Sequence, residues 1–397
     1  MQIVGIISEY NPFHLGHLGQ INKTKQVLGE DCAIVCVMSG NFVQRGEPAI
    51  FAKHARAEAA VLCGVDLVIE LPSPYALSSA EGFARGGVFL LDALGVCDYI
   101  SFGSEYGEIE PLATAAEMIV TQTANELIVK WLEKGISYAA AQQKVADELM
   151  GEESKVFSSP NNLLGIEYLK ALTLYNSDLK PMTVTRTGGE HDGDTGYSAS
   201  RLRKIICSGG LPWDDMPKAS AEICKREIEQ SRGPVSVKKH FEIALLSRLR
   251  MLSELDFLSV PDATEGLDKR MARYAHSEPT IDAMLEKIKT KRYAMSRIRR
   301  MLMCAALGIT ANDTVEPPAY IRVLAINEMG MDILSKAREK AKLPIITKPA
   351  SIQKMKGRAV EMFYKEAAIT DFYSLAFNSE QHRIGGNEWR QTPIILV

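Results

Sequence analysis

The chain has 397 residues, of which 46% are hydrophobic and 24% are charged, and its 46 lysine and arginine residues against 49 aspartate and glutamate residues give a net charge of −3. This length predicts two or three domains, and the composition excludes a disordered, fibrous or disulfide-rich chain. The net charge also argues against a generally basic nucleic-acid binder.

The cysteines and the hydropathy pattern indicate a cytoplasmic protein. The seven cysteines are scattered, with no Cys-x-x-Cys pair, which predicts free thiols in a reducing compartment rather than a zinc ribbon. The first residues lack the basic region of a signal peptide, and no run of 18 apolar residues occurs. We therefore expect no membrane span.

The first half of the chain alternates short apolar runs with helical patterns. The runs predict buried strands at Ile3–Ile7, Ala33–Met38, Leu67–Leu71, Tyr99–Phe102 and Met182–Arg186. Between them we predict helices over Leu15–Leu28, Lys53–Cys63 and Ser79–Leu94, and a longer helical stretch over Leu112–Met150. This alternation favours an α/β fold with a doubly wound parallel sheet, whose ligands bind at the carboxyl ends of the strands.

The second half of the chain shows mainly helical periodicity. We predict helices over Phe241–Leu255, Leu267–Ala275, Ile281–Leu307 and Pro318–Ala341. Two further apolar segments are Leu343–Ile346 and Ile394–Val397. Glycine and proline near residues 208–235 indicate the boundary, so we predict a catalytic domain over residues 1–208 and a mainly α-helical domain over residues 209–397.

The loop after the first predicted strand carries the pattern His-x-Gly-His, formed by His14, Gly16 and His17. The N-terminus of the following helix offers unpaired backbone N–H groups and a positive dipole end, which suit a phosphate. Gly16 lets a nucleotide approach the backbone, and the imidazoles can donate hydrogen bonds to phosphate oxygens in the transition state. Helix caps and metal ligands are the alternatives. The strand–loop–helix context favours adenylyl transfer, and no third ligand stands at a zinc-site spacing.

These features resemble the nucleotidyltransferase superfamily, which combines such histidines with a later Ser-x-Thr/Ser-x-x-Arg motif. Here Ser198, Ser200 and Arg203 occupy that motif. A closer resemblance, to the tRNA(Met) cytidine acetate ligase family, rests on residues 9–14, 38–48, 64–72 and 102–105, and residues 159–165 and 290–293 extend it. One departure is Arg201, where that family more often has a small hydroxyl residue.

The resemblance implies a Rossmann-like nucleotidyltransferase domain and a reaction in two steps. ATP, as its Mg²⁺ complex, and acetate would give acetyl-adenylate and pyrophosphate, without acetyl-CoA and without a metal site built from protein ligands. The acetyl group would then pass to N4 of the wobble cytidine of elongator tRNA(Met), giving N4-acetylcytidine. The family's ATP site corresponds here to Ile7, Ser8, Glu9, Tyr10, Asn11, Pro12, Phe13, His14, Leu15, Gly16, His17, Leu18, Gly19, Gln20, Gly103, Asn161, Asn162, Arg186, Thr187, Ser198 and Ser200.

The candidate catalytic residues are His14, His17, Lys53 and Arg203. Lys53 follows the second predicted strand, where its ammonium could neutralise the triphosphate or the acetate carboxylate. The alternative for Lys53 is a solvated helix face, and the same two interpretations are open for Arg45 and Arg56.

The helical half contains a basic segment. Lys238 to Arg300 contains 14 basic against 9 acidic residues, a balance of +5 that leaves −8 for the rest of the chain. Its most basic part has no acidic residue and predicts a tRNA-binding surface formed by Lys287, Lys289, Lys291, Arg292, Arg297, Arg299 and Arg300. The alternative is an ordinary charged helix face.

We therefore predict an ATP-dependent ligase that acetylates tRNA(Met). One rival is a small-molecule nucleotidyltransferase that adenylylates a cofactor precursor, which would not need the basic helical half. The other is an RNA-binding protein with a relic nucleotide fold, which the intact motif residues disfavour.

Overall fold

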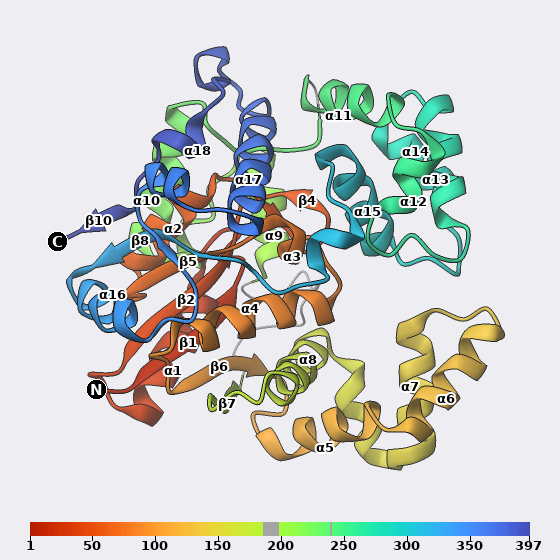
Figure 1. Ribbon diagram of the computed structural model, residues 1–397, viewed down its shortest axis with the longest axis horizontal. Coiled ribbons are helices and arrows are strands. Elements are labelled where there is room, and N and C mark those ends of the chain that lie inside the picture. Colours follow the sequence, from red (N-terminus) through yellow and green to blue (C-terminus); the bar gives the residue numbers. More distant parts are fainter. Residues whose placement is uncertain (186–197, 239) are drawn as a thin grey trace.

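A mostly parallel sheet lies at the centre of the molecule in the computed structural model, which describes residues 1–185, 198–238 and 240–397 (Figure 1). The strand order is β10-β8-β5-β2-β1-β6-β7, and β9 pairs with β8. The strands of the first half pair in parallel, and they are β1 (Ile3–Ser8), β2 (Ala33–Ser39), β5 (Leu67–Leu71), β6 (Tyr99–Ser104) and β7 (Lys180–Thr185). The predicted α/β fold and its parallel sheet are confirmed.

Strands from the second half of the chain complete the sheet. β8 (Ile321–Asn327) runs antiparallel to β5, and β10 (Ile394–Leu396) and β9 (Ile345–Ile346) run parallel to β8. The prediction of a helix over Pro318–Ala341 is therefore wrong in its first half. A short apolar run fits a buried strand as well as a buried helix, and pairing with β5 selects the strand. The sheet takes strands from both sides of residue 208, and the predicted domain boundary there stays a prediction.

The helices of the first half are α1 (Leu15–Leu28), α2 (Lys53–Leu62), α3 (Ser73–Ala76), α4 (Ala80–Leu94), α5 (Ile109–Ile119), α6 (Gln122–Glu133), α7 (Tyr138–Met150), α8 (Pro160–Leu174) and α9 (Ala199–Cys207), with the 3₁₀ turn η1 (Gly151–Ser158). The stretch predicted as helical over Leu112–Met150 thus divides into separate helices. The hydroxyls of Thr121 and Ser137 cap α6 and α7. Such residues favour a new helix start.

The helices that follow are α10 (Lys218–Glu229), α11 (His240–Arg250), α12 (Glu254–Ser259), α13 (Leu267–Ser277), α14 (Ile281–Ile288), α15 (Met295–Leu307), α16 (Glu328–Lys340), α17 (Arg358–Ser374) and α18 (Asn387–Arg390). Short 3₁₀ turns are η2 (Trp213–Asp215), η3 (Ala311–Thr314), η4 (Pro349–Lys354) and η5 (Glu380–His382). A short hairpin, β3 (Phe42–Val43) and β4 (Glu47–Pro48), follows β2. No described helix has the length and apolar character that a membrane crossing requires.

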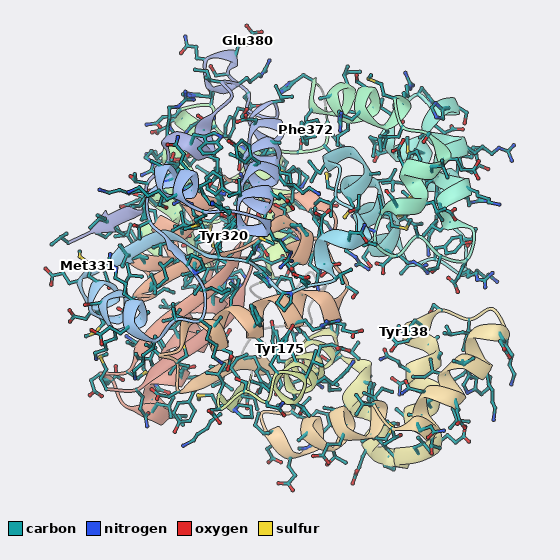
Figure 2. All side chains as sticks on the ribbon, viewed as in Figure 1. Tyr138, Tyr175, Tyr320, Met331, Phe372 and Glu380 are labelled. Atoms are coloured by element: carbon teal, nitrogen blue, oxygen red, sulfur yellow. The ribbon has the colours of Figure 1, made fainter. Side chains whose placement is uncertain are left out.

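Alternate residues of each strand enter the cores on the two faces of the sheet. In β1, Ile3 and Ile7 pack into the core with α4 and α8, while Val4 and Ile6 pack into the core with α1 and α2. Helices α11–α15 pack around a core that also takes in Phe42 of β3 and Tyr373 of α17, and they form a group beside the sheet (Figure 1). Figure 2 shows buried Tyr320 in the middle of the layers and exposed Met331 and Tyr138 at the periphery.

Candidate active site

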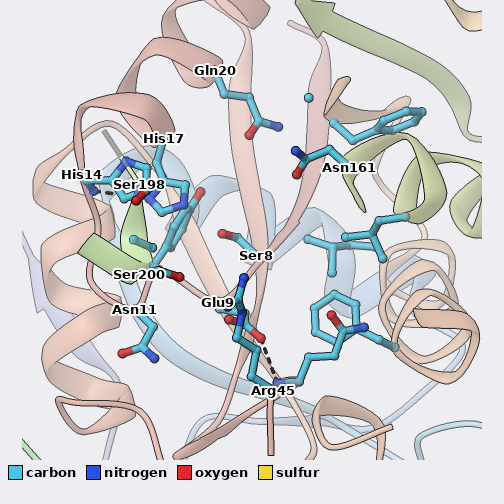
Figure 3. Close-up of a pocket in the computed structure, with 18 of the residues that line it drawn as sticks. Ser8, Glu9, Asn11, His14, His17, Gln20, Arg45, Asn161, Ser198 and Ser200 are labelled. Atoms are coloured by element: carbon cyan, nitrogen blue, oxygen red, sulfur yellow. Dashed lines mark hydrogen bonds between the residues drawn. The ribbon is translucent and has the colours of Figure 1, made fainter. Parts of the chain in front are cut away.

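A cavity of about 190 Å³ lies at the carboxyl ends of β1 and β6 (Figure 3). The chain continues from β1 to β2 on one side and later reaches β6 on the other side of β1. The connections therefore diverge at this point, which is where open α/β sheets bind their ligands. We call this space the ATP cavity, after the ligand that the sequence resemblance predicts for these residues. Its walls come from the end of β1 and the loop after it, the end of β6, the hairpin β3–β4, and the helices α1, α4, α8 and α9.

The two histidines stack at the N-terminus of α1. Their ring centroids are 3.8 Å apart with an angle of 25° between the planes. His14 Nδ1 accepts a hydrogen bond from Gly16 N at 3.0 Å, and His17 Nδ1 accepts one from His14 N at 3.3 Å. Because each Nδ1 is an acceptor, the neutral rings carry their protons on Nε2. Both side chains line the cavity, and their Nε2–H groups are the donors that such a pair can offer to a ligand.

The loop between β1 and α1 is held by partners from other elements. Asn11 Oδ1 accepts a hydrogen bond from Ile50 N at 2.9 Å. Arg56 is buried and donates to the carbonyls of Glu9, Ser39, Gly40 and Phe51. Arg56, for which a site role and a solvated face were both open, thus ties together the loops after β1 and β2. Tyr10 has a φ of 44°, a strained conformation that such packing can maintain.

On the opposite wall of the cavity, Asn161 and Asn162 have different roles, which the sequence could not distinguish. Asn161 lines the cavity and its Nδ2 donates to Glu105 Oε1 at 2.6 Å. Asn162 is buried, and its Oδ1 accepts a hydrogen bond from Glu105 N at 3.0 Å. Asn162 therefore positions the loop after β6, beside Gly103, rather than facing the cavity.

The cavity wall also has an apolar part, which the sequence motifs did not predict. It consists of Phe83, Phe102, Leu164 and Tyr168, and the rings of Phe102 and Tyr168 are 5.5 Å apart. Leu164 and Tyr168 follow Asn161 by three and seven residues, so they share its face of α8. That spacing was a usable signal. Gln44 was also missed, and the Glu9 carboxylate binds its backbone N–H at 2.8 Å.

The second motif closes the cavity from α9. Ser198 caps this helix, its Oγ accepting from Arg201 N at 3.2 Å. Arg203 donates to Asn11 O at 3.0 Å and to Ser200 Oγ at 3.1 Å, so the motif contacts the loop after β1. Burial lowers the pKa of the Arg203 guanidinium from its ordinary value. Arg201, the departure from the family pattern, pairs instead with Asp215 at 2.7 Å.

The structure brings together most of the residues predicted for ATP. Those that line the cavity are Ile7, Ser8, Glu9, Tyr10, Asn11, His14, His17, Gln20, Gly103, Asn161, Ser198 and Ser200, together with Arg203 and Arg45. Residues of the same predicted set that do not line it are Pro12, Phe13, Leu15, Gly16, Leu18, Gly19 and Asn162. Arg186 and Thr187 lie outside the described residues.

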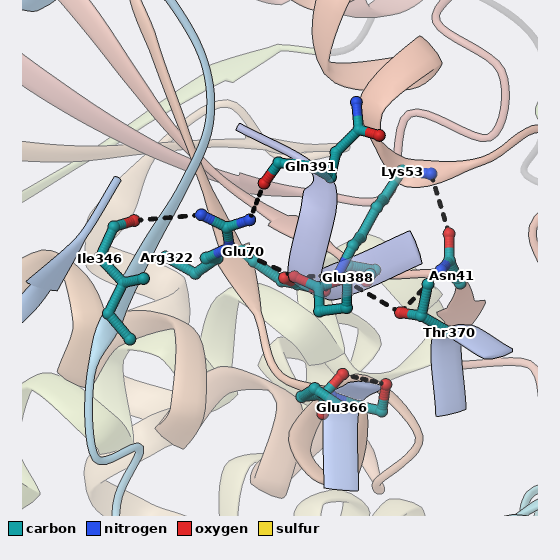
Figure 4. Close-up of polar contacts among 12 residues, drawn as sticks. Asn41, Lys53, Glu70, Arg322, Ile346, Glu366, Thr370, Glu388 and Gln391 are labelled. Carbon is teal, nitrogen blue, oxygen red and sulfur yellow. Dashed lines mark hydrogen bonds and ion pairs between the residues drawn. The ribbon is translucent and has the colours of Figure 1, made fainter. Parts of the chain in front are cut away.

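Lys53 lies away from the ATP cavity, in a buried ion cluster beside β2 and β5 (Figure 4). Its Nζ is 2.7 Å from Glu70 Oε1 and 2.7 Å from Glu388 Oε2, and Arg322 Nε is 3.2 Å from Glu388 Oε1. Burial lowers the pKa of the Lys53 ammonium, but the Glu388 and Glu70 carboxylates outweigh it and raise this pKa overall. We refer to Lys53, Glu70, Arg322 and Glu388 as the ion cluster.

The predicted tRNA-binding segment is partly neutralised by carboxylates from outside it. Arg297 and Arg292 lie 2.8 and 3.5 Å from Glu265, and Arg300 lies 3.5 Å from Asp262. Arg299 NH1 is 2.5 Å from Glu47 Oε1 of β4. The exposed basic residues of the segment are Lys287, Lys289, Lys291 and Arg292. The segment itself contains no acidic residue, so its own sequence gave no sign of these partners.

Comparison with known proteins finds similarity over the whole chain. The family model described as HIGH Nucleotidyl Transferase matches residues 1–388. A tRNA(Met) cytidine acetate ligase of Acetivibrio thermocellus is 36% identical over all of both chains, and one of Thermoanaerobacter sp. (strain X514) is 39% identical over 96% of each. The crystal structure of Thermotoga maritima TmcAL bound with alpha-thio ATP covers all of both chains, with a TM-score of 0.92 and 34% identity.

Proposed function

Because the chain belongs to the HIGH nucleotidyl transferase family, among its tRNA(Met) cytidine acetate ligases, we propose that it activates acetate with ATP and acetylates a cytidine of tRNA(Met). The chain is thus a ligase for ATP-dependent acetylation of tRNA cytidine. The observation that carries the assignment to chemistry is the stacked His14–His17 pair, at a helix N-terminus, in the cavity between β1 and β6.

The ATP cavity has a polar and an apolar part, which suit the two ends of a nucleotide. We place the phosphates near the start of α1, where the Nε2–H donors of the histidines lie. Arg203 and Ser200 face them from α9. The adenine ring packs against the apolar wall of Phe102, Leu164 and Tyr168. ATP enters as its magnesium complex, since phosphate oxygens bind Mg²⁺ with few protein ligands.

The first step forms acetyl-adenylate. An oxygen of the acetate carboxylate attacks the α-phosphorus, and the bond from that phosphorus to the oxygen that bridges to the β-phosphate breaks, releasing pyrophosphate. The nucleophile and leaving group need no proton transfer, so the protein contributes positioning and charge stabilisation. The histidines stabilise the negative charge that develops on the α-phosphate oxygens, and Arg203 stabilises the pyrophosphate.

The second step transfers the acetyl group. The exocyclic N4 of cytidine attacks the acetyl carbon, the mixed anhydride bond breaks, AMP leaves, and the amine loses one proton. The wobble cytidine of elongator tRNA(Met) is the proposed acceptor, and acetyl-CoA has no part in either step. The exposed residues Lys287, Lys289, Lys291 and Arg292 form the proposed tRNA contact in the helical half, although Arg292 also pairs with Glu265. Arg297, Arg299 and Arg300 are less exposed and are engaged by carboxylates.

Incubation of the protein with ATP, labelled acetate and tRNA tests this function. Label should enter tRNA and depend on ATP. Label from acetyl-CoA but not from acetate would contradict the ligase assignment.

His17→Ala removes one phosphate donor, and loss of one such donor costs about 10²–10³ in rate. Acetate-dependent exchange of labelled pyrophosphate into ATP measures the rate of acetyl-adenylate formation. Exposed His276 in α13 provides the control His276→Ala, which should retain exchange. Full activity in His17→Ala would remove this histidine from the mechanism.

A further inference from the structure

A second, larger groove adjoins the ATP cavity. It has a volume of about 770 Å³ and lies between α9 on one side and the segment before α11, with α14 and α15, on the other. Arg45, Ser198, Ser200 and Arg203 line both spaces, so the two are continuous at the second motif. We call the larger space the α9 groove. Its volume lies within the usual range for ligand sites, whereas nothing in the ATP reaction itself requires it.

The charges that line the α9 groove are predominantly positive. Six are basic (Arg45, Arg201, Arg203, Lys204, Lys238 and Arg299), and three are acidic (Glu47, Glu242 and Asp282). Several are already engaged, since Arg201 pairs with Asp215, Arg299 pairs with Glu47, and Glu242 accepts a hydrogen bond from Ile281 N. The excess of positive charge makes the groove attractive to a polyanion.

Lys204 and Lys238 are the exposed cations of this groove. Neither forms an ion pair with any residue in the described part of the chain, in contrast to Arg297 and Arg300 of the predicted basic segment. They come from different elements: Lys204 follows Arg203 in α9, and Lys238 follows the segment that enters the helical half. Two exposed ammonium groups from different elements lining one groove can neutralise phosphates along a strand.

An apolar recess opens from the same place. Val237, Leu249 and Met303 line it, and it shares Glu47, Val237, Asp282 and Arg299 with the α9 groove. A free phosphate or pyrophosphate has no use for an apolar surface, whereas an unstacked base of single-stranded RNA gains from one. The combination of cations and an apolar recess therefore favours an RNA strand over a small anion.

We propose that the α9 groove binds the single-stranded RNA that carries the target cytidine, with Lys204 and Lys238 contacting its phosphates. The cytidine then reaches the acetyl-adenylate past Arg45 and Ser200, where the groove meets the ATP cavity. This proposal rests on the proposed function. It adds a surface that lies outside the basic segment, residues 287–300, which the sequence predicted to bind tRNA. It places the RNA strand against α9 of the catalytic half and not solely against the helical half.

The test is tRNA binding by the full-length double variant Lys204→Glu/Lys238→Glu, measured at several salt concentrations. Binding should weaken at least tenfold. The slope of log K against log salt should fall by about 1.4–1.8 if each lysine neutralises one phosphate. A merely structural role would leave that slope unchanged. Lys204→Ala/Lys238→Ala, which introduces no repulsion, should give the same fall in slope, and it serves if the charge reversal does not fold.

The matched control is Lys336→Glu/Lys340→Glu, which reverses two exposed lysines on α16, on the other side of the molecule from α11–α15 (Figure 1). Its binding and slope should match those of the unchanged protein. Equal slopes for the α9 groove variants and the control would overturn the proposal. Binding of tRNA is measured without acetate or ATP, so failure of the α9 groove is distinguished from failure of the ligase reaction, which shows as absent acetate incorporation by the unchanged protein.

Discussion

Two polar regions at the carboxyl edge of one sheet differ in what their charges face. Beside β1 and β6, the stacked histidines and Arg203 line the ATP cavity. Beside β2 and β5, Lys53 of the ion cluster lies 2.7 Å from Glu70 and from Glu388, with both side chains almost fully removed from solvent. In the first region the donors line a cavity, whereas in the second region the charged groups pair with one another.

The difference comes from the elements that cover the strand ends. Glu388 lies on α18 and Arg322 on β8, so segments more than 250 residues away along the chain close the β2–β5 side. At β1 and β6 the connections diverge and leave a crevice. A lysine after a parallel strand is therefore evidence for a ligand site only when the elements packed against it are known.

The largest effect that tests this comparison is a loss in the free energy of unfolding, which we expect from Lys53→Met. The Glu70 and Glu388 carboxylates would stay buried without the cation they share, and breaking a buried ion pair from one side costs about 3–5 kcal/mol. Urea unfolding followed by circular dichroism measures the free energy of unfolding. Lys218, whose side chain is 92% exposed, provides the control Lys218→Met, which should change this free energy by at most about 0.5 kcal/mol.

Lys53→Met can also contradict the structural role that this comparison gives to Lys53. If its free energy of unfolding matched that of the unchanged protein while pyrophosphate exchange disappeared, Lys53 would belong to the reaction, as its place after β2 had indicated. The ion cluster would then not be the structural counterpart of the ATP cavity.

A smaller effect is expected from pH, through Glu366 of α17. Burial and the neighbouring Glu70 carboxylate raise the pKa of Glu366 to about 8, although Lys53 and hydrogen bonds from Ser73 oppose this. The unfolded chain releases this proton near the ordinary value of 4.5, so the folded state holds an extra proton between these two values. The free energy of unfolding therefore falls as pH rises through that window, by at most about 1.4 kcal/mol per pH unit.

Glu366→Gln removes this titration and should flatten the dependence. Urea unfolding at intervals from pH 5.5 to pH 8.5 compares it with the unchanged protein, a range set by the pKa of about 8. Glu361→Gln, an exposed position on the same helix, is the control and should keep the slope. Identical slopes for Glu366→Gln and the unchanged protein would mean that Glu366 is ionised in the folded state.

The smallest effect is expected from Arg201→Ser, which restores the small hydroxyl residue of the related motif. Arg201 pairs with Asp215 at 2.7 Å and is partly exposed, so its loss should cost at most about 1 kcal/mol in stability. The Kd for ATP, measured by calorimetry, should change less than about twofold, or ~0.4 kcal/mol. Arg203→Ala provides the contrast and should weaken ATP binding. A tenfold loss in Arg201→Ser would place Arg201 at the phosphates.

Much of the ATP cavity could be predicted because its chemistry is local. His14, Gly16 and His17 are close neighbours in the chain, and they follow a strand whose apolar run is typical of a parallel sheet. Gln44 was missed since an amide in a hairpin has no distinctive local pattern, whereas Tyr168 was missed although its spacing from Asn161 on α8 was a usable signal. The strand β8 was missed because its apolar run fitted a helix equally well.

The sequence by itself determined the parallel strands of the first half, the starts of α1 and α2 and the histidine motif, since each depends on residues close to one another in the chain. Only the tertiary structure decided which charges line a cavity and which are buried against a carboxylate. Lys53 meets Glu388, and Arg299 meets Glu47, across 335 and 252 positions of the chain. An ammonium or guanidinium group binds substrate or a carboxylate according to what is packed against it, and no local pattern records that neighbour.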